Sequence, residues 1–498
     1  MAQGYLSSSN EMQSLEDVGN QYVKILMMRS FFQDTSMDKF GHIESFKMHD
    51  LIHDLAMSVA RSDCYLDTER KGIVGKPMHV AFDNGTNCSL DVFNVCKLRT
   101  IIVTWAIELI TEKLKYLRAL DVSFSPITEL PKSIVEVITK LINLRELNIE
   151  ECKAFEEMLP AGLGKLTSLQ CLSNFVVGDY EKGTTGRLNE LKELNNIRGR
   201  FCINNLGWVR DVASESHETN LRSKKYIEDL SLLWGAERYG SGECEIKNSD
   251  SLMLLDNLCP HQNVRELSVN GFPGVKFSDW VISLTNIVSI KLYSLPNCEH
   301  LPPLERLPCL KDLEIFDMKK LERIGDNKVG NENEIHVSVP PFPRLSSLTI
   351  TRCPKLTYMP PFPHVQNLVL SSCRVKAILE TCMVKHETSS FCPLSALERL
   401  QLDEVTEIEG MAEGWMKNLT SLQSLSLRQL STVEVVLPQL QHLPSQLKQL
   451  EISFDSDKLH LWKEENHKCD TQLKVEKIDP KLLTSQTFTY TEIDSSKG

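Results

Sequence analysis

His49 and His53 stand four residues apart in the stretch FKMHDLIHDLAMSVA (residues 46–60), and Asp50 lies beside the first of them. On a helix this spacing places two imidazoles one turn apart, where they can bind a metal ion as in the zinc motif H-E-x-x-H. That motif requires a glutamate as general base and a third ligand, whereas Asp50 is one methylene shorter. The next histidine, His79, follows a stretch with glycine and proline, at a spacing that the motif does not use. We therefore expect no metal site here.

The same stretch also carries an apolar stripe at helical spacing, formed by Met48, Ile52, Leu55 and Val59. Residues at this spacing share one side of a helix, so they predict a helix that packs on a hydrophobic core. A histidine beside such a stripe is typically half-buried and hydrogen-bonded to a backbone carbonyl. We interpret His53 in this way.

The bulk composition limits the classes of function. A length of 498 residues exceeds one ordinary core, which predicts several domains or an elongated repeat. The net charge of −12 and the lack of a run of Lys and Arg disfavour nucleic acid as a partner. No stretch approaches the ~20 apolar residues of a membrane span, and the first residues do not resemble a secretory signal. The 15 cysteines form no C-x-x-C pair, so we expect reduced thiols and a cytoplasmic location.

One phrase recurs from about residue 97 onward, with the skeleton L-x-x-L-x-L and a cysteine or small residue three places later. Examples are LINLRELNIEEC (residues 141–152), RLSSLTITRC (residues 344–353) and SLQSLSLRQL (residues 421–430). The spacing between copies falls in the range of roughly 20 to 29 residues that is typical of leucine-rich repeats. The sequence therefore predicts a leucine-rich-repeat solenoid.

The alternation at the end of the phrase predicts how each repeat folds. In a short strand the second and third leucines point the same way into the core, and the residues between them face outward. A single turn cannot bury its leucines alone, so parallel strands must stack into an α/β solenoid, a parallel β horseshoe. Cys152, Cys353 and Cys373 stand at the recurring position where the chain turns inward, and we interpret them as small buried hydrophobes.

Three stretches do not fit the regular spacing and are expected to form loops or extra elements, where binding residues often lie. They are residues 178–200, 310–345 and 365–397. A fourth stretch, AGLGKLTSL (residues 161–169), contains Gly164-Lys165 but lacks the P-loop pattern, because Leu159 stands at the first glycine position and Leu166 follows the lysine. We interpret it as a repeat turn.

Three segments together resemble the plant nucleotide-binding leucine-rich-repeat disease-resistance proteins of the coiled-coil class. They are the N-terminal stretch from MAQGYLSS to FKMHDLIHDLA, residues 271–325 with their Cys-Glu-x-Leu-Pro-Pro-Leu run, and FPRLSSLTITRCPKLTYMP (residues 342–360). The resemblance extends from the first residue to about residue 454. It implies a partial, helical winged-helix domain at residues 1–66, a linker and repeat cap at 67–95, repeats at 96–454 and an irregular tail at 455–498.

The resemblance implies a cytoplasmic immune receptor, in which the repeats recognise a pathogen effector or a modified host protein and restrain a nucleotide switch. In that family the Met-His-Asp histidine contacts the phosphate of bound ADP. The matching residue is His49, between Met48 and Asp50.

The expected partner-binding residues lie between the core leucines of the strands. Tyr293 and Phe316 are the expected anchors, since exposed aromatic residues dominate interface energetics. The charged candidates are Arg145, Glu146, Arg265, Lys291, Arg399 and Arg428.

Other functions remain open from the sequence. A leucine-rich-repeat adaptor, such as a substrate receptor of a ubiquitin ligase, would need a helical ligase-binding box near the start, and a truncated regulatory decoy is a further alternative. A DNA-binding winged helix is disfavoured because its helix carries two aspartates and no basic residue before Arg61. No arrangement of residues suggests catalysis.

The chain begins within the winged helix, so the resemblance places the phosphate-binding loop and its lysine outside it. One imidazole cannot replace them. We therefore expect no cofactor for this chain alone, ADP or ATP only in the complete family protein, and the missing nucleotide-binding domain as a partner. Calorimetric titration with ADP should give no heat of binding, and stoichiometric binding at micromolar affinity would contradict this expectation.

Overall fold

The computed structural model forms two compact units, Met1–Ile227 and Glu228–Gly498, which are described separately. The described residues are 2–7, 15–37, 43–60, 63–66, 76–82, 97–103, 113–125, 136–152, 159–178, 185–235, 248–325, 341–376, 378–379, 394–408, 415–430, 443–444, 447–454 and 487–489.

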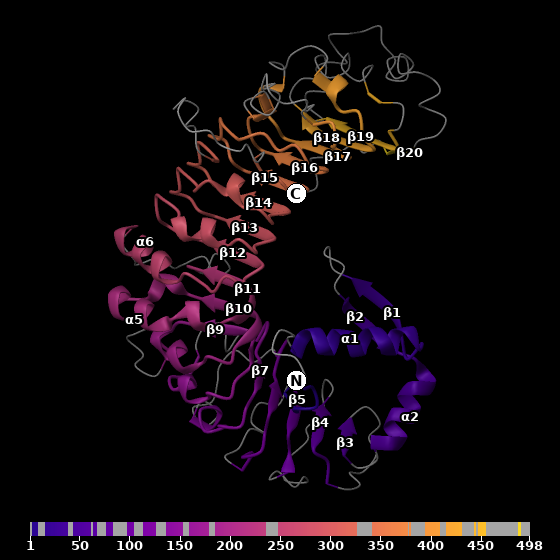
Figure 1. Ribbon diagram of the computed structural model, residues 1–498, viewed down its shortest axis with the longest axis vertical. Helices are drawn as coiled ribbons and strands as arrows, with labels where there is room; N and C mark the ends of the chain where they lie inside the picture. The colour runs from indigo at the N-terminus through magenta and orange to yellow at the C-terminus, as the bar shows by residue number, and fades with distance from the viewer. Residues whose placement is uncertain are drawn as a thin grey trace, which may run out of the picture. The chain divides into compact units, whose positions relative to one another are not determined.

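The first unit opens with two helices and a hairpin (Figure 1). Helix α1 (Leu15–Met28) is followed by strands β1 (Phe32–Met37) and β2 (Ile43–Met48), which pair antiparallel, and by helix α2 (Asp50–Ala60). The ring centroids of Phe32 and Phe46 lie 4.2 Å apart across the hairpin. The start of the chain thus has the helix and hairpin elements of a winged helix.

The apolar stripe of α2 is exposed to solvent. Leu51, Leu55 and Val59 are 73%, 56% and 72% exposed, and α2 has no buried residue. The prediction that this helix packs on a core is therefore wrong for the described part of the chain. Periodicity shows that a helix is amphipathic, but it does not show which element covers the apolar side.

A parallel ladder of short strands follows α2. Its strands are β3 (Cys64–Leu66), β4 (His79–Phe82), β5 (Thr100–Val103), β6 (Ala119–Asp121), β7 (Glu146–Asn148) and β8 (Cys171–Leu172). The ladder begins at residue 64, before the expected start of the repeats at residue 96. Strands β3 and β4 carry too few leucines to show the repeat phrase, yet Val80 and Phe82 are buried as core residues.

A separate parallel pair in the first unit, outside the sheet of β3 to β8, is formed by β9 (Asn174–Val176) and β10 (Arg198–Asn204). In the described part of residues 178–200, where the sequence predicted loops or extra elements, the structure has the 3₁₀-helix η6 (Leu188–Glu193) and the start of β10. Leu188, Leu191 and Leu194 are fully buried. Further helices in the described part of this unit include η4 (Leu163–Lys165), η6 (Leu188–Glu193), η7 (Leu206–Trp208), α5 (Val212–Thr219) and η8 (Leu221–Ser223).

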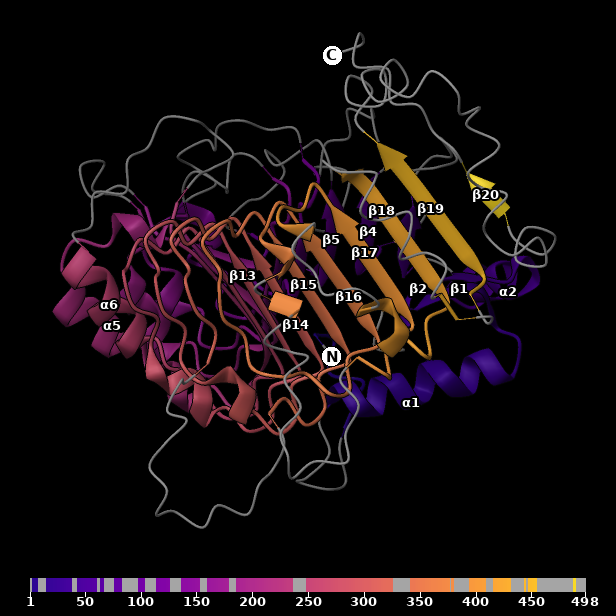
Figure 2. The ribbon, with the colours of Figure 1, turned by 90° about the horizontal axis from the view of Figure 1, so that it is seen from above.

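The second unit consists of parallel strands in sequence order, seen side by side in Figure 2. They are β11 (Tyr226–Leu233), β12 (Glu266–Asn270), β13 (Ser289–Tyr293), β14 (Asp312–Phe316), β15 (Ser347–Thr351), β16 (Asn367–Ser371), β17 (Arg399–Asp403), β18 (Ser424–Leu430), β19 (Gln449–Phe454) and β20 (Thr487–Thr489). The helices are α6 (Asn248–Asn257), η10 (Asp279–Ser283), η11 (Leu304–Arg306) and η13 (Trp415–Asn418).

The strands confirm the predicted division between core and surface. In β13, Ile290 and Leu292 are buried, and the same pattern repeats in register from β11 to β18. We call the residues of these strands that are in register with Glu266, Ser268 and Asn270 of β12 the strand face. Strand β20 pairs with β19 within the stretch expected to be an irregular tail. Residues 326–340 and 380–393, in the two remaining expected loops, lie outside the described residues.

The residue after each of the strands β12 to β17 has a left-handed backbone. This column contains Gly271, Ser294, Asp317, Arg352, Ser372 and Glu404, with φ between 49° and 72°. The N–H group of each residue donates to the last carbonyl of the next strand, as from Ser294 to Phe316 at 2.8 Å. These bonds extend the ladder beyond the strands and turn the chain inward.

The inward turn explains the recurring cysteines. Cys152, Cys353 and Cys373 are 0%, 0% and 2% exposed, so their interpretation as buried hydrophobes is confirmed. Burial raises the pKa of the Cys353 and Cys373 thiols to about 12, which keeps them protonated and unreactive. Among the described helices, none is long and apolar enough to cross a membrane.

Candidate functional site

His49 and His53 have different surroundings. His49 lies just before α2, where its carbonyl accepts the N–H groups of Ile52 and His53 at 2.9 Å and its Nδ1 accepts the N–H of Leu51 at 3.3 Å. The His53 side chain is 56% exposed and lies 3.5 Å from a carboxylate oxygen of Asp54. The interpretation of His53 as a half-buried residue bonded to a backbone carbonyl is therefore wrong, because the side of α2 on which it lies is open.

His79, considered above as a third metal ligand, is hydrogen-bonded elsewhere. Its Nδ1 lies 2.9 Å from the hydroxyl of Thr100 on the adjacent strand. Burial, with a contribution from the Arg99 guanidinium, lowers the pKa of His79 below its ordinary value. Within the described residues, no group of three or more His, Cys, Asp or Glu side chains could hold a metal ion.

The glycine-containing turn at residues 161–169 binds an anion that the protein itself provides. The Glu190 carboxylate accepts the backbone N–H groups of Gly162 and Gly164 at 2.8 and 3.1 Å. Gly162 has φ 100°, and a Cβ on Gly164 would lie 2.8 Å from the Glu190 carbonyl oxygen, so both glycines are required. The turn therefore resembles a phosphate loop in its chemistry but is filled by a side chain of the neighbouring repeat.

Tyr293 and Phe316 lie side by side on the strand face, in register on β13 and β14. Their ring centroids are 6.3 Å apart, and both side chains are half-buried rather than exposed. Burial and a hydrogen bond to the Glu314 carboxylate raise the pKa of the Tyr293 phenol well above its usual range. The guanidinium of Arg352 lies 5.3 Å from the Phe316 ring centroid.

Several of the predicted partner-binding cations already have polar neighbours. Lys291 lies 3.9 Å from Glu266 across two strands, and Arg399 donates from Nε to the Asn367 side chain at 2.6 Å. Arg265 is exposed immediately before β12.

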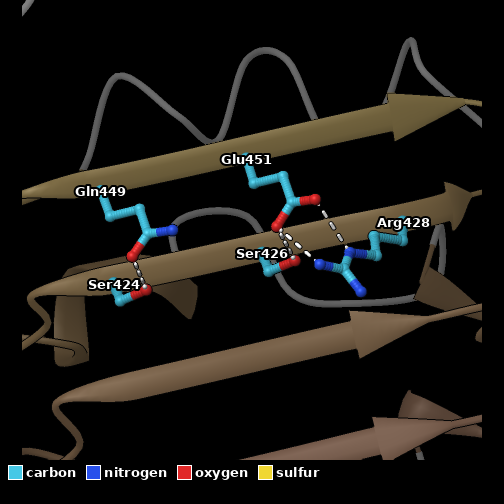
Figure 3. A network of polar contacts seen from close by, with 5 residues as sticks. All are labelled: Ser424, Ser426, Arg428, Gln449 and Glu451. Atoms are coloured by element: carbon cyan, nitrogen blue, oxygen red, sulfur yellow. Dashed lines mark hydrogen bonds and ion pairs between the residues drawn. The ribbon is translucent and has the colours of Figure 1, made fainter. Parts of the chain in front are cut away.

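Arg428 forms the strongest of these contacts. It donates to both carboxylate oxygens of Glu451 at 3.0 and 2.9 Å, and Ser426 donates to the same carboxylate at 3.1 Å (Figure 3). The bond from Arg428 holds the pKa of Glu451 below its ordinary value. Such a bidentate pair fixes its geometry, so Arg428 is less available to a partner than its sequence position suggests.

Arg145 and Glu146 lie near the start of the chain. Arg145 donates to the carbonyl of Ala2 at 3.4 Å, and Arg118 donates to the carbonyl of Gln3 at 2.7 Å. The Gln3 amide donates to the Thr100 hydroxyl at 2.8 Å. Glu146 is half-buried here, and its pKa is raised by burial and by the nearby Asp121. The structure thus brings Arg145 against the protein's own N-terminal segment.

A second contact links α1 to strand β10. Glu16 lies 3.6 Å from Arg198, which is only 9% exposed, and the Arg198 guanidinium lies 4.7 Å from the Tyr226 ring centroid. We refer to the contacts of residues 2–7 and α1 with Thr100, Arg118, Arg145 and Arg198 as the N-terminal contact.

Sequence reasoning missed Arg118 and Arg198. A signal was present for the first, because arginine follows leucine immediately before successive strands at Arg99, Arg118 and Arg145. This recurrence places the arginines on consecutive strands of one ladder. Arg198 stands after a different phrase and has no comparable signal.

Glu190→Ala should lower the free energy of unfolding by about 1–3 kcal/mol, because two backbone N–H groups lose their acceptor. Glu190→Gln retains an amide oxygen and should cost less. Urea unfolding measures both, with Lys192→Ala on the exposed side of η6 as the control. Equal stability of Glu190→Ala and Lys192→Ala would contradict the assignment.

Comparisons with known proteins give two domain matches. Residues 1–56 match the winged-helix domain of disease resistance proteins, and residues 188–318 match the R13L1/DRL21 leucine-rich repeats. Neither match is to a catalytic domain.

The chain is also similar to whole plant proteins. It is 29% identical over 402 residues to the putative disease resistance protein RGA1 of Solanum bulbocastanum, covering 70% of this chain and 36% of the relative. It is 29% identical over 505 residues to the putative disease resistance protein At3g14460 of Arabidopsis thaliana, covering 87% of this chain and 35% of the relative. The chain thus spans about a third of the length of these relatives.

Two bacterial proteins are among the solved structures that are similar to the chain. A leucine-rich-repeat protein of Leptospira interrogans, LIC12759, is 16% identical with a TM-score of 0.37, covering 76% of this chain and 96% of that one. An internalin of Listeria monocytogenes, InlF, is 16% identical with a TM-score of 0.35, covering 70% of this chain and 85% of that one.

Proposed function

Because the chain is homologous to plant disease resistance proteins, with their winged helix at its start and R13L1/DRL21-type repeats after it, we propose that it works as part of a cytoplasmic immune receptor. In this proposal the first repeats hold the winged helix in its resting position. The strand face of the second unit recognises a pathogen effector or a modified host protein. The chain acts by binding partners and catalyses no reaction.

The observation that carries the proposal is the N-terminal contact. Arg118 and Arg145 donate to backbone carbonyls of residues 2 and 3, and Arg198 pairs with Glu16 of α1. These arginines stand on the same repeats whose leucines form the core, so the stacked strands fix their positions. A displacement of the repeats would change the hold on the winged helix.

The N-terminal contact is suited to release because it is polar and incompletely satisfied. Three buried polar atoms in it have no hydrogen-bond partner within the described part of the chain: Gln3 Oε1, Glu16 Oε1 and Arg198 Nε. Each such atom costs about 1–3 kcal/mol, which offsets much of what the charged hydrogen bonds contribute. Because the net free energy of the N-terminal contact is then small, a partner that binds the released state more tightly can shift the equilibrium toward that state.

The winged helix provides two surfaces for the rest of a nucleotide switch. We assign His49, between Met48 and Asp50, the contact with an ADP phosphate when a nucleotide-binding domain is present. The exposed Leu51, Leu55 and Val59 of α2 then form an apolar surface for that domain. The winged-helix match over residues 1–56 occupies the place where an adaptor of a ubiquitin ligase would carry its ligase-binding box, which favours the receptor.

Arg118→Ala combined with Arg145→Ala should speed amide hydrogen exchange in α1 (Leu15–Met28), because the N-terminal segment loses two charged donors. We expect an increase of about tenfold, corresponding to ~1.4 kcal/mol of lost stabilisation. Exchange is measured by mass spectrometry on the 498-residue chain.

Arg265→Ala is the matched control, because Arg265 also stands immediately before a strand, in the second unit. It should leave exchange in α1 unchanged. If the double variant exchanges at the wild-type rate, the N-terminal contact does not hold the winged helix.

A further inference from the structure

Five cations gather on three consecutive turns of the second unit, those that follow β14, β15 and β16. We call them the basic turn patch: Lys319, Lys320, Arg352, Lys355 and Arg374, all exposed. Within residues 317–320, 352–355 and 372–375 the single acidic residue is Asp317. The patch is therefore strongly positive in a chain whose net charge is −12.

The strand register brings these turns together. Phe316, Thr351 and Ser371 are paired partners at the ends of the three strands, so the turns follow one another at the strand spacing of about 4.8 Å. Lys320 donates a hydrogen bond to the Asn297 side chain in the preceding turn at 2.9 Å. Arg374 forms a parallel β-bridge with Thr406 in the following turn. The cations thus lie on consecutive rungs rather than on scattered loops.

The ion pairs within and beside the patch are long and exposed. Lys319 lies 3.9 Å from Asp317, and Arg374 lies 3.8 Å from Glu407. Exposed pairs of this kind contribute at most about 1 kcal/mol, so a partner can replace them at little cost.

An apolar anchor adjoins the cations. The Arg352 guanidinium lies over the Phe316 ring, and Phe316 contacts Tyr293 on the preceding strand. Aromatic residues beside an arginine are the combination most enriched at sites that dominate binding energy. The surface therefore combines charge with one place for an apolar side chain.

We propose that the basic turn patch binds a short acidic segment of a partner protein, with an apolar or aromatic residue of that segment packing on Phe316 and Tyr293. This inference rests on the proposed function, in which the second unit recognises a protein. It specifies the chemistry of the recognised segment: carboxylates spaced along three rungs, and a neighbouring hydrophobic side chain.

The limits of the patch favour a short peptide over a nucleic acid or a membrane. The turn after β17 carries Glu404 and Glu407, and the described turn after β13, residues 294–297, carries no charge. Three rungs cover only about 10 Å. An extended polyanion would continue past this length onto acidic surface and be repelled.

Fluorescence anisotropy on the 498-residue chain tests the proposal, with a fluorescein-labelled synthetic peptide of glutamates flanking one tryptophan as the probe. Arg352→Glu with Lys355→Glu should weaken binding by about tenfold or more at low ionic strength. Lys311→Glu is the matched control, because Lys311 is an exposed cation at the opposite end of β14. It should bind like the wild type. Replacing the tryptophan by serine should also weaken binding.

Three results would overturn the proposal: no binding of the peptide, equal weakening by Lys311→Glu, or tighter binding of phosphatidylserine vesicles or single-stranded RNA than of the peptide. Circular dichroism confirms that each variant is folded. Amide exchange in α1 reports on the N-terminal contact independently, so a failure here is distinguishable from a failure of the proposed function.

Discussion

Neighbouring strands stack through their paired aliphatic side chains, and this stacking fixes the positions of the outward-facing side chains and of the turns. Leu267 and Val269 of β12 pack against Ile290 and Leu292 of β13, and no strand of this length could bury its side chains alone. The pairing also fixes the outward positions in columns about 4.8 Å apart. Residues at equivalent positions of neighbouring repeats therefore lie side by side, and their side chains can be the same or different.

The two units use these columns differently. In the first unit, Arg118 and Arg145, which precede strands, contact the N-terminal segment, and Arg198, the first residue of β10, pairs with Glu16 of α1. In the second unit the strand face carries an aromatic pair, Tyr293 and Phe316, and the turns beyond it carry the basic turn patch. Arg145 and Arg265 illustrate the contrast: both stand before a strand, but only Arg145 has an intramolecular contact with residues 2–7 among the described residues. One repeated unit thus positions both the N-terminal contact and the surface that we propose binds a partner.

The sequence was sufficient to predict the repeats, their inward leucines and the buried cysteines, because each depends on local periodicity. It did not reveal β3, β4 or β10, since their core residues include Val80 and Phe201 rather than the regular leucines. The left-handed column was also not predictable. Residues such as Arg352 and Glu404 have no intrinsic preference for that conformation, and the bond to the next strand imposes it.

The candidate site was less accessible to sequence reasoning than the fold. The sequence predicted that Tyr293 and Phe316 lie on adjacent strands, but their half-burial and the bond of Tyr293 to Glu314 depend on neighbouring strands. The N-terminal contact could not be foreseen, because backbone carbonyls accept from Arg118 and Arg145 and carbonyls leave no signature in a sequence. Helix α2 shows a related limit. Its apolar stripe was evident from the sequence, but the sequence did not show whether another element would cover that stripe.

The proposed hold of the repeats on the winged helix depends most on the ion pair between Glu16 of α1 and Arg198. A double-mutant cycle with Glu16→Gln and Arg198→Gln, read from the free energy of opening of α1 by native-state hydrogen exchange, isolates their coupling. We predict a favourable coupling of about 1 kcal/mol, because the pair is largely buried. If the effects of the two substitutions are additive, the two residues have no coupling and do not act as a pair that holds α1.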